Sequence, residues 1–158
     1  MTEEDLSLAL FQAALHDPTI TVLSWQAVDG KTYFTADVIL RLPNDERVAP
    51  DLVILVCNRS VWLIEVKDSH RKALDDEAKL QRLVTELGTT EILSQISRRA
   101  VAHIQDCELR LAVAFDEDLP SRDGACVPSV VHISWGYIRE EVERSGLAAA
   151  LTRLVLSA

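Results

Sequence analysis

The sequence predicts a mixed α/β fold, with one domain over residues 1–158 and a mixed central β-sheet flanked by helices. Segments with the 3.6-residue period of a helix alternate with short apolar runs rich in β-branched residues, which is typical of this class. The chain is long enough to bury a full hydrophobic core without disulfides or a structural metal. With 48% hydrophobic residues and charges mixed throughout, the composition is that of a globular protein.

The first part of the chain is predicted to form a helix followed by a β-hairpin. Thr2 precedes three acidic residues, which is typical of a capped helix N-terminus, and Asp17-Pro18 ends that helix. Asp29-Gly30 indicates a hairpin turn, because it lies between two segments rich in Thr, Val, Ile and aromatic residues. We therefore expect, in order, strands over residues 19–28 and 32–42 and a further turn over residues 43–46.

Residues 50–67 are the stretch that indicates a chemistry. Two apolar runs, over 50–57 and 60–67, are typical of buried strands. Asp51 opens the first run, and Glu65 and Lys67 close the second. Charged side chains in buried strands are costly unless they are paired or bind a metal. These three residues therefore need a partner.

The second half of the chain predicts two helices, two strands and a closing helix. Apolar residues recur at helical spacing up to Leu87, and Gly88 is suited to end that helix. Thr89 or Thr90 can cap a second helix, whose apolar stripe extends to Ile104. We then expect strands over residues 109–115 and 127–135, separated by an acidic loop, and a helix over residues 138–156.

The register of the hairpin over residues 50–67 decides whether its charged side chains meet. Glu65 and Lys67 share a face, because side chains two apart on a strand point the same way. A plain two-residue turn at Asn58-Arg59 would place Asp51 on the opposite face from Glu65. A three-residue connection, or one bulge, would instead set Asp51 opposite Glu65. We predict this second register.

Metal-dependent hydrolysis is the chemistry that fits these three residues. Two adjacent carboxylates repel each other unless a cation neutralises them, and Mg²⁺ prefers such oxygen ligands together with water and phosphate. An amine beside a metal-bound water can orient or deprotonate it and stabilise a phosphate transition state. The competing interpretation is structural: a salt bridge of Glu65 with Lys67, or of Lys67 with Asp51, at the exposed end of a sheet.

The arrangement resembles the PD-(D/E)xK nuclease superfamily, whose restriction-endonuclease-like core has the order α-β-β-β-α-β. The matching residues are Pro50-Asp51 and Glu65-Val66-Lys67, with thirteen residues between Asp51 and Glu65. The resemblance implies this core with an extra strand and a C-terminal helix. It also implies a Mg²⁺ site, with Mn²⁺ as the alternative ion, in which Asp51, Glu65 and the Val66 carbonyl are ligands and Lys67 serves the attacking water. DNA is the expected substrate.

Two further site positions follow from the resemblance. Many members add a Glu from the first helix, which matches Glu4, with Glu3 or Asp5 as alternatives; the competing interpretation is that these acids only cap the helix. Some members place a Gln or a basic residue on the helix after the Lys. Gln81 is the first match and Lys79 the second, and a solvated helix position is the competing interpretation.

The net charge of −9 limits how this protein can bind nucleic acid, because affinity comes largely from Lys and Arg neutralising phosphates. A basic contact surface must therefore be local. The residues that could form it are His70, Arg71, Lys72, Lys79, Arg82, Arg98 and Arg99. For each of these residues, an equal alternative to nucleic-acid contact is that the side chain is solvated and balances the charge of a nearby acid. We therefore expect a homodimer or a subunit of a larger complex, with residues 147–156 as the interface if they are exposed.

Several classes of protein are disfavoured by the sequence. Cys57, Cys107 and Cys126 are odd in number and far apart, which argues against a disulfide framework and a cysteine metal site. The lack of a membrane-length apolar run predicts a cytoplasmic protein without a membrane partner. A metal-dependent nuclease is the preferred function. The alternatives are a catalytically silent nuclease-fold subunit that binds a protein or nucleic acid, and a different Mg²⁺ phosphohydrolase or unrelated α/β protein.

Overall fold

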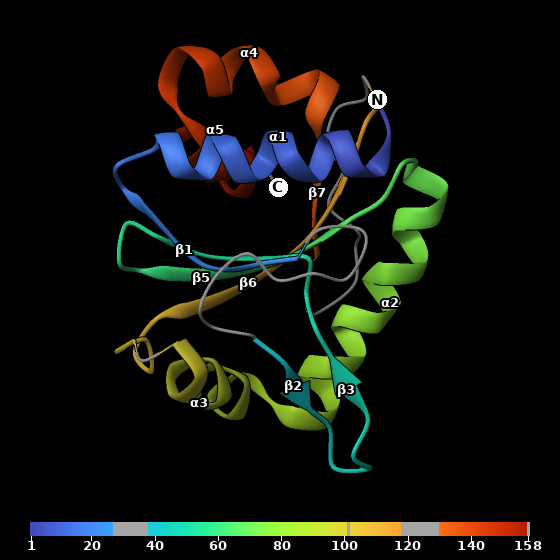
Figure 1. Cartoon of the computed structure of the whole chain (residues 1–158), viewed down its shortest axis with the longest axis vertical. Coiled ribbons are helices and arrows are strands. Elements are labelled where there is room, and N and C mark those ends of the chain that lie inside the picture. The colour runs from blue at the N-terminus through green and yellow to red at the C-terminus, as the bar shows by residue number, and fades with distance from the viewer. Residues whose placement is uncertain (27–37, 101, 118–129, 158) are drawn as a thin grey trace.

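The computed structural model describes residues 1–26, 38–100, 102–117 and 130–157. Within these residues five strands form a mixed sheet, and helices cover both of its faces (Figure 1). The strand order is β1 (Ile20–Trp25), β4 (Leu52–Val56), β5 (Ser60–Val66), β6 (Glu108–Phe115) and β7 (Val130–Ser134). β1, β4 and β5 form an antiparallel meander, whereas β6 and β7 continue the sheet in parallel with β5. The predicted mixed α/β class is therefore confirmed.

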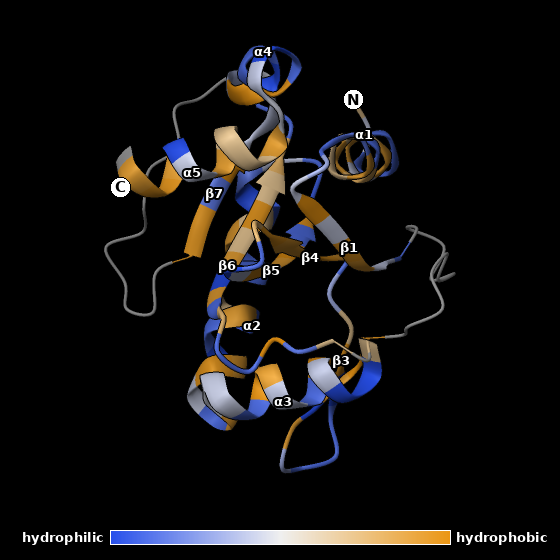
Figure 2. Ribbon diagram, turned by 90° about the vertical axis from the view of Figure 1, so that its left-hand side faces the viewer, coloured by the Kyte–Doolittle hydropathy of each residue, from blue (hydrophilic) through white to orange (hydrophobic). Residues whose placement is uncertain are grey.

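One face of the sheet is covered by α1 (Glu3–His16), α4 (Trp135–Ser145) and α5 (Leu147–Ser157). Their apolar side chains, such as Leu10 and Leu151, share one buried cluster with strand residues such as Ile64. Figure 2 shows the matching hydropathy, with hydrophobic colouring along the central strands and over most of α5. Thr2 caps α1 as predicted, because its side-chain oxygen accepts a hydrogen bond from the Asp5 N–H at 3.1 Å.

The opposite face is covered by α2 (His70–Leu87), α3 (Thr89–Ala100) and a small hairpin of β2 (Leu40–Arg41) and β3 (Arg47–Val48). Both predicted helices are confirmed, and Gly88 ends α2 with a φ of 80°. The turn predicted over residues 43–46 is also present, because the Leu42 N–H donates to the Glu46 carbonyl at 2.8 Å. Side chains of Leu63 and Leu80 meet in the core of this face.

The strand predicted over residues 32–42 differs from the structure. Only its end is described, and there β2 pairs with β3 in a separate two-stranded sheet rather than with β1. The predicted turn at Asp29-Gly30 lies outside the described residues. The difference arises because β2 packs against α3, a contact between distant segments that local strand propensity does not encode.

The single closing helix predicted over residues 138–156 is wrong, because the structure has two helices there. Gly146 separates α4 from α5 with a φ of 92°, a conformation that favours glycine. α4 also begins at Trp135, which the sequence places at the end of a strand. The start of α5 is held by the Ala148 N–H, which donates to Asp17 Oδ2 at 2.9 Å. Asp17 lies at the far end of α1, so this cap is a tertiary feature.

Candidate functional site

The hairpin of β4 and β5 has the register that brings Asp51 to Glu65. Val56 pairs with Ser60, so residues 57–59 form a three-residue connection, and two of these residues have positive φ angles. The same register sets Asp51, the residue before β4, opposite Glu65. The predicted register is therefore confirmed, and both side chains lie on the face of the sheet that α2 covers.

Asp51 and Glu65 form a pair of acids, of which Glu65 is buried and Asp51 is half-buried. Asp51 Oδ2 accepts a hydrogen bond from the Val66 N–H at 2.8 Å, which fixes this carboxylate across the hairpin. Glu65 is only 3% exposed. Burial, followed by the charge of Asp51 and a hydrogen bond to it, raises the pKa of Glu65 to about 9, although Lys79 Nζ lies 3.3 Å from Glu65 Oε1 and opposes the shift. Glu65 therefore holds a proton at neutral pH.

Lys67 lies directly after β5, and its backbone N–H still pairs with the Ala114 carbonyl of β6 at 2.9 Å. Its Nζ lies 3.6 Å from Glu3 Oε1 and 3.6 Å from Asp76 Oδ2. Burial lowers the pKa of Lys67, but the charges of Asp76, Glu3 and the two hairpin acids outweigh burial and raise it. Lys67 therefore stays protonated at neutral pH, which favours water orientation and charge stabilisation over deprotonation.

Asp76 is a site residue that the sequence prediction omits. It lies on α2 and is 9% exposed, and its Oδ2 has no hydrogen-bond partner among the described residues. Burial is the largest cause that raises the pKa of Asp76, while the charges of Lys67 and Lys79 oppose the shift. One sequence signal could have identified Asp76. It lies three residues after Ala73, within the apolar stripe of the helix, where an acid is unexpected.

The structure changes two of the predicted helix positions. The acid of α1 that contacts Lys67 is Glu3, whereas Glu4 is exposed. On α2, Lys79 contacts Glu65, although the sequence places Gln81 first. Gln81 is half-buried and lies on a different stripe of the helix, because an advance of two residues rotates the side chain by about 200°. Glu3 and Lys79, which the sequence gives as the second choices, are therefore the helix residues in contact with the motif, and the roles of Glu4 and Gln81 stay predictions.

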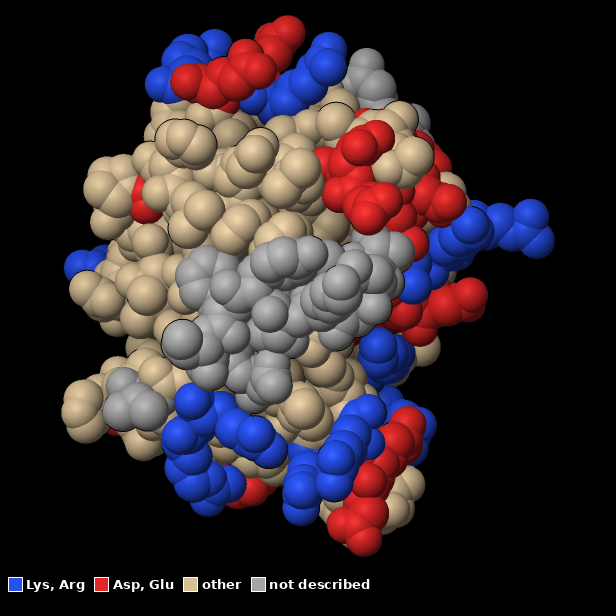
Figure 3. Space-filling model, viewed as in Figure 1, with Lys and Arg blue, Asp and Glu red and all other residues tan. Residues whose placement is uncertain are grey.

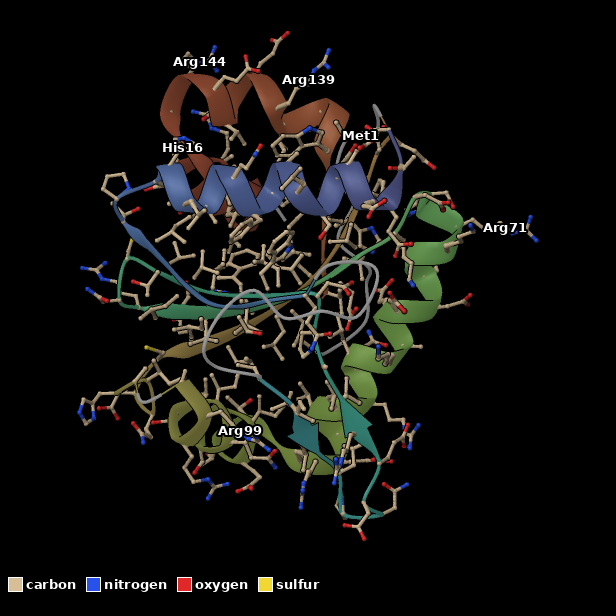
Figure 4. All side chains as sticks on the ribbon, in the orientation of Figure 1. Met1, His16, Arg71, Arg99, Arg139 and Arg144 are labelled. Atoms are coloured by element: carbon tan, nitrogen blue, oxygen red, sulfur yellow. The ribbon has the colours of Figure 1, made fainter. Side chains whose placement is uncertain are left out.

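The predicted nucleic-acid contacts around α2 are largely neutralised by acids. Two of these residues form ion pairs, Lys72 with Asp68 and Arg82 with Glu46 and Glu86, and Lys79 Nζ contacts the Glu65 carboxyl at 3.3 Å. The His70 ring packs at 4.9 Å from the Phe115 ring, between centroids. Arg71 is exposed and extends away from the molecule (Figure 4). These residues therefore give the molecule little free positive charge beside the motif.

Asp51 and Glu65 are the residues that would hold a metal. Within residues 1–26, 38–100, 102–117 and 130–157, no group of three or more His, Cys, Asp or Glu side chains is arranged as a metal site. Mg²⁺ does not require such a group, because it takes one or two carboxylates and completes its shell with water and substrate phosphate. The acid pair fits a nearby divalent cation electrostatically, and Asp76 adds a carboxylate whose Oδ2 makes no hydrogen bond among the described residues, although Lys67 Nζ lies 3.6 Å from it.

No protein-family model, curated protein or solved structure matches this chain. Its function is therefore inferred from the geometry of the site alone. Separately, none of the helices in the described part of the chain is both long enough and apolar enough to cross a membrane.

Proposed function

We propose that this protein is a metal-dependent nuclease that hydrolyses phosphodiester bonds, with DNA as the expected substrate. The observation that carries the proposal is the pair of the half-buried Asp51 and the buried Glu65, set opposite each other by the hairpin register, with Lys67 following on the same face. Repulsion within such a pair is relieved by a divalent cation, and a fixed ammonium beside it suits a phosphate substrate.

The order of the elements supports the same proposal. The chain runs through α1, then the antiparallel strands β1, β4 and β5, then α2 and the parallel strand β6. This order is compatible with the α-β-β-β-α-β core that the resemblance implies, if β2, β3 and α3 are insertions and β7 is the extra strand. Asp51 directly precedes β4, Glu65 lies in β5 and Lys67 directly follows it.

Each residue of the site has a role in this proposal. Asp51 and Glu65 would hold a Mg²⁺ ion, with the Val66 carbonyl as a further ligand, and the ion would supply Lewis acidity and lower the pKa of a coordinated water. Lys67 orients that water and stabilises the negative charge that develops on the phosphate. Glu3 and Asp76 act through Lys67 as positioning residues, because they flank its ammonium and keep it charged.

Cleavage assays test the proposal directly. Plasmid, linear duplex DNA, single-stranded DNA and RNA are incubated with Mg²⁺ or Mn²⁺ and either the wild type, Glu65→Gln or Lys67→Met. The matched controls are Glu108→Gln and Arg139→Gln, which change exposed charges away from the site. We expect the two site variants to lose cleavage by about 100-fold or more, and the controls to match the wild type. Cleavage by Glu65→Gln at the wild-type rate would contradict the proposal.

A catalytically silent subunit that binds a protein partner or nucleic acid is the second candidate. The net charge of −9, the ion pairs of Lys72 and Arg82, and the contact of Lys79 with Glu65 favour it, because they reduce the basic surface available to a substrate. Calorimetric titration with Mg²⁺ separates the two functions. Binding that is lost in Glu65→Gln supports the nuclease, whereas no binding in the wild type supports the silent subunit.

A further inference from the structure

Four exposed arginines from three elements gather on one side of the molecule. Arg41 lies in β2, Arg47 in β3, and Arg98 and Arg99 in the last turn of α3. We call these four residues the arginine surface. Figure 3 shows Lys and Arg side chains collected over this lower part of the molecule, and Figure 4 places Arg99 there. A local basic surface is notable in a chain with a net charge of −9.

Specific tertiary hydrogen bonds assemble the arginine surface. The Arg41 N–H donates to Gln95 Oε1 at 2.8 Å, and Gln95 Nε2 donates to the Arg41 carbonyl at 3.1 Å. This pair of bonds holds β2 against α3. As a result, Arg41, Arg98 and Arg99 line one pocket of about 340 Å³, although Arg41 and Arg98 are far apart in sequence.

The arginine surface has more positive charge than its surroundings balance. Arg41 and Arg47 are direct cross-strand partners, and like charges in that position destabilise a hairpin. Arg98 pairs with Glu91 at 3.6 Å, but no acid pairs with Arg41, Arg47 or Arg99 among the residues that the structure describes. Such a juxtaposition is relieved when an anion binds between the guanidinium groups.

One member of the arginine surface, Arg47, is close in sequence to the candidate active site. Arg47 precedes Asp51 by four residues, so their Cα atoms are at most about 14 Å apart even in a fully extended chain. That distance corresponds to roughly four phosphate steps along the axis of a duplex. The member of the arginine surface in β3 therefore lies within this distance of Asp51.

We propose that the arginine surface binds the phosphate backbone of the nucleic acid that is cut at Asp51 and Glu65. Guanidinium groups bind phosphate oxygens in a bidentate manner, and their distribution over β2, β3 and α3 suits successive phosphates better than a single small anion. The inference rests on the proposed nuclease function for its chemistry. It adds the contact surface that α2, with its paired basic residues, does not provide.

Binding without cleavage tests this inference. Fluorescence anisotropy in EDTA measures the affinity for labelled duplex DNA, single-stranded DNA and RNA over a range of KCl concentrations. The test variants are Arg98→Gln/Arg99→Gln and Arg41→Gln/Arg47→Gln. The control is Arg139→Gln/Arg144→Gln, which removes the same charge from the exposed side of α4 (Figure 4). Thermal unfolding verifies that all variants are folded.

Each test variant is expected to reduce the slope of log affinity against log salt by about 1.8, because two phosphate contacts are lost. At 0.1 M salt this corresponds to a loss of affinity of up to about 60-fold. The control variant keeps the wild-type slope. Comparison among duplex DNA, single-stranded DNA and RNA identifies which nucleic acid supplies the backbone.

Three results would overturn the inference. The wild type does not bind nucleic acid, the test variants bind as tightly as the control, or a polyglutamate of the same charge displaces the labelled nucleic acid as well as unlabelled nucleic acid does. The outcome is separable from that of the cleavage assays. If the wild type cleaves nucleic acid but the test variants keep its salt slope, only the role of the arginine surface is contradicted. Arginine-dependent binding without any cleavage supports the surface and contradicts the nuclease.

Discussion

At the residue scale, Glu65 holds its proton because its carboxyl is buried beside Asp51. Its pKa lies at about 9 in the folded protein, whereas a glutamate exposed to water has a pKa near 4.5. Between these values the folded state binds one more proton than the unfolded state, so this group lowers the free energy of unfolding as pH rises through the window. A metal would reverse the effect, since it favours the ionised carboxylate.

Replacement of Glu65 with Gln should remove this pH dependence, because Gln resembles the protonated acid in shape and charge. We expect the free energy of unfolding of the wild type in EDTA to fall relative to that of Glu65→Gln as pH rises from about 5 to about 9. Urea denaturation at three pH values measures the difference.

Addition of Mg²⁺ at pH 8 provides the control for this prediction. It should stabilise the wild type but not Glu65→Gln, because binding requires the ionised carboxylate. If the free energies of unfolding of the wild type and Glu65→Gln change in parallel with pH in EDTA, Glu65 does not hold a proton in the folded protein.

At the scale of the elements, the break between α4 and α5 depends on two features of Gly146. Its φ of 92° is combined with a ψ of 164°, a region that is essentially restricted to glycine. A Cβ at this position would also lie 3.0 Å from Asp17 Oδ2, the acceptor that caps α5. Gly88 shares the first feature, with a φ of 80° and a ψ of 156°, but a Cβ there would meet nothing within 4 Å.

Comparison of Gly146→Ala with Gly88→Ala therefore separates backbone strain from the contact with Asp17. Both changes should lower the free energy of unfolding by on the order of 1–3 kcal/mol through strain. Gly146→Ala should lower it further, because the new methyl group displaces the Asp17 carboxylate from the Ala148 N–H. Chemical denaturation measures both values, and equal losses would show that Asp17 does not matter to the break.

At the scale of the whole molecule, α5 belongs to the core. Its residues Leu147, Leu151 and Leu154 are at most 7% exposed and pack with α1 and the sheet. Leu156 is the exception at 80% exposure. The segment predicted as an interface if exposed is thus mostly internal, and the expectation of a homodimer or larger complex stays a prediction.

Two leucines of α5 test this assignment. Leu151→Ala should lower the free energy of unfolding by about 2–5 kcal/mol, because it leaves a cavity between α5 and the sheet. Leu156→Ala should change it by less than about 0.5 kcal/mol. Sedimentation of both variants accompanies the denaturation. A large destabilisation or a change in oligomeric state from Leu156→Ala would place Leu156 in an interface.

Charge is also distributed unevenly over the whole molecule. Figure 3 shows acidic side chains gathered near the N-terminal ends of α1 and α2, whereas Lys and Arg side chains collect over α3 and the β2–β3 hairpin. The net charge of −9 therefore describes the chain but not each of its surfaces. Steering of a polyanion depends on the local potential, so the arginine surface can act within an acidic protein.

The sequence by itself determined the mixed α/β class, the boundaries of α1, the end of α2 at Gly88, the existence of α3, and the register that joins Asp51 to Glu65. These features depend on helical periodicity, helix caps and turn length, which act over about a dozen residues or fewer. For the same reason, three of the site residues could be predicted from one hairpin.

Only the tertiary structure decided which distant residues complete the site. Glu3 rather than Glu4 reaches Lys67, because adjacent helix residues differ by about 100° in direction and the packing of α1 selects one. Asp76, the cap between Asp17 and α5, and the contact of Arg41 with α3 likewise join segments distant in sequence. Local propensity carries no information about such contacts, because they form only when packing brings the elements together.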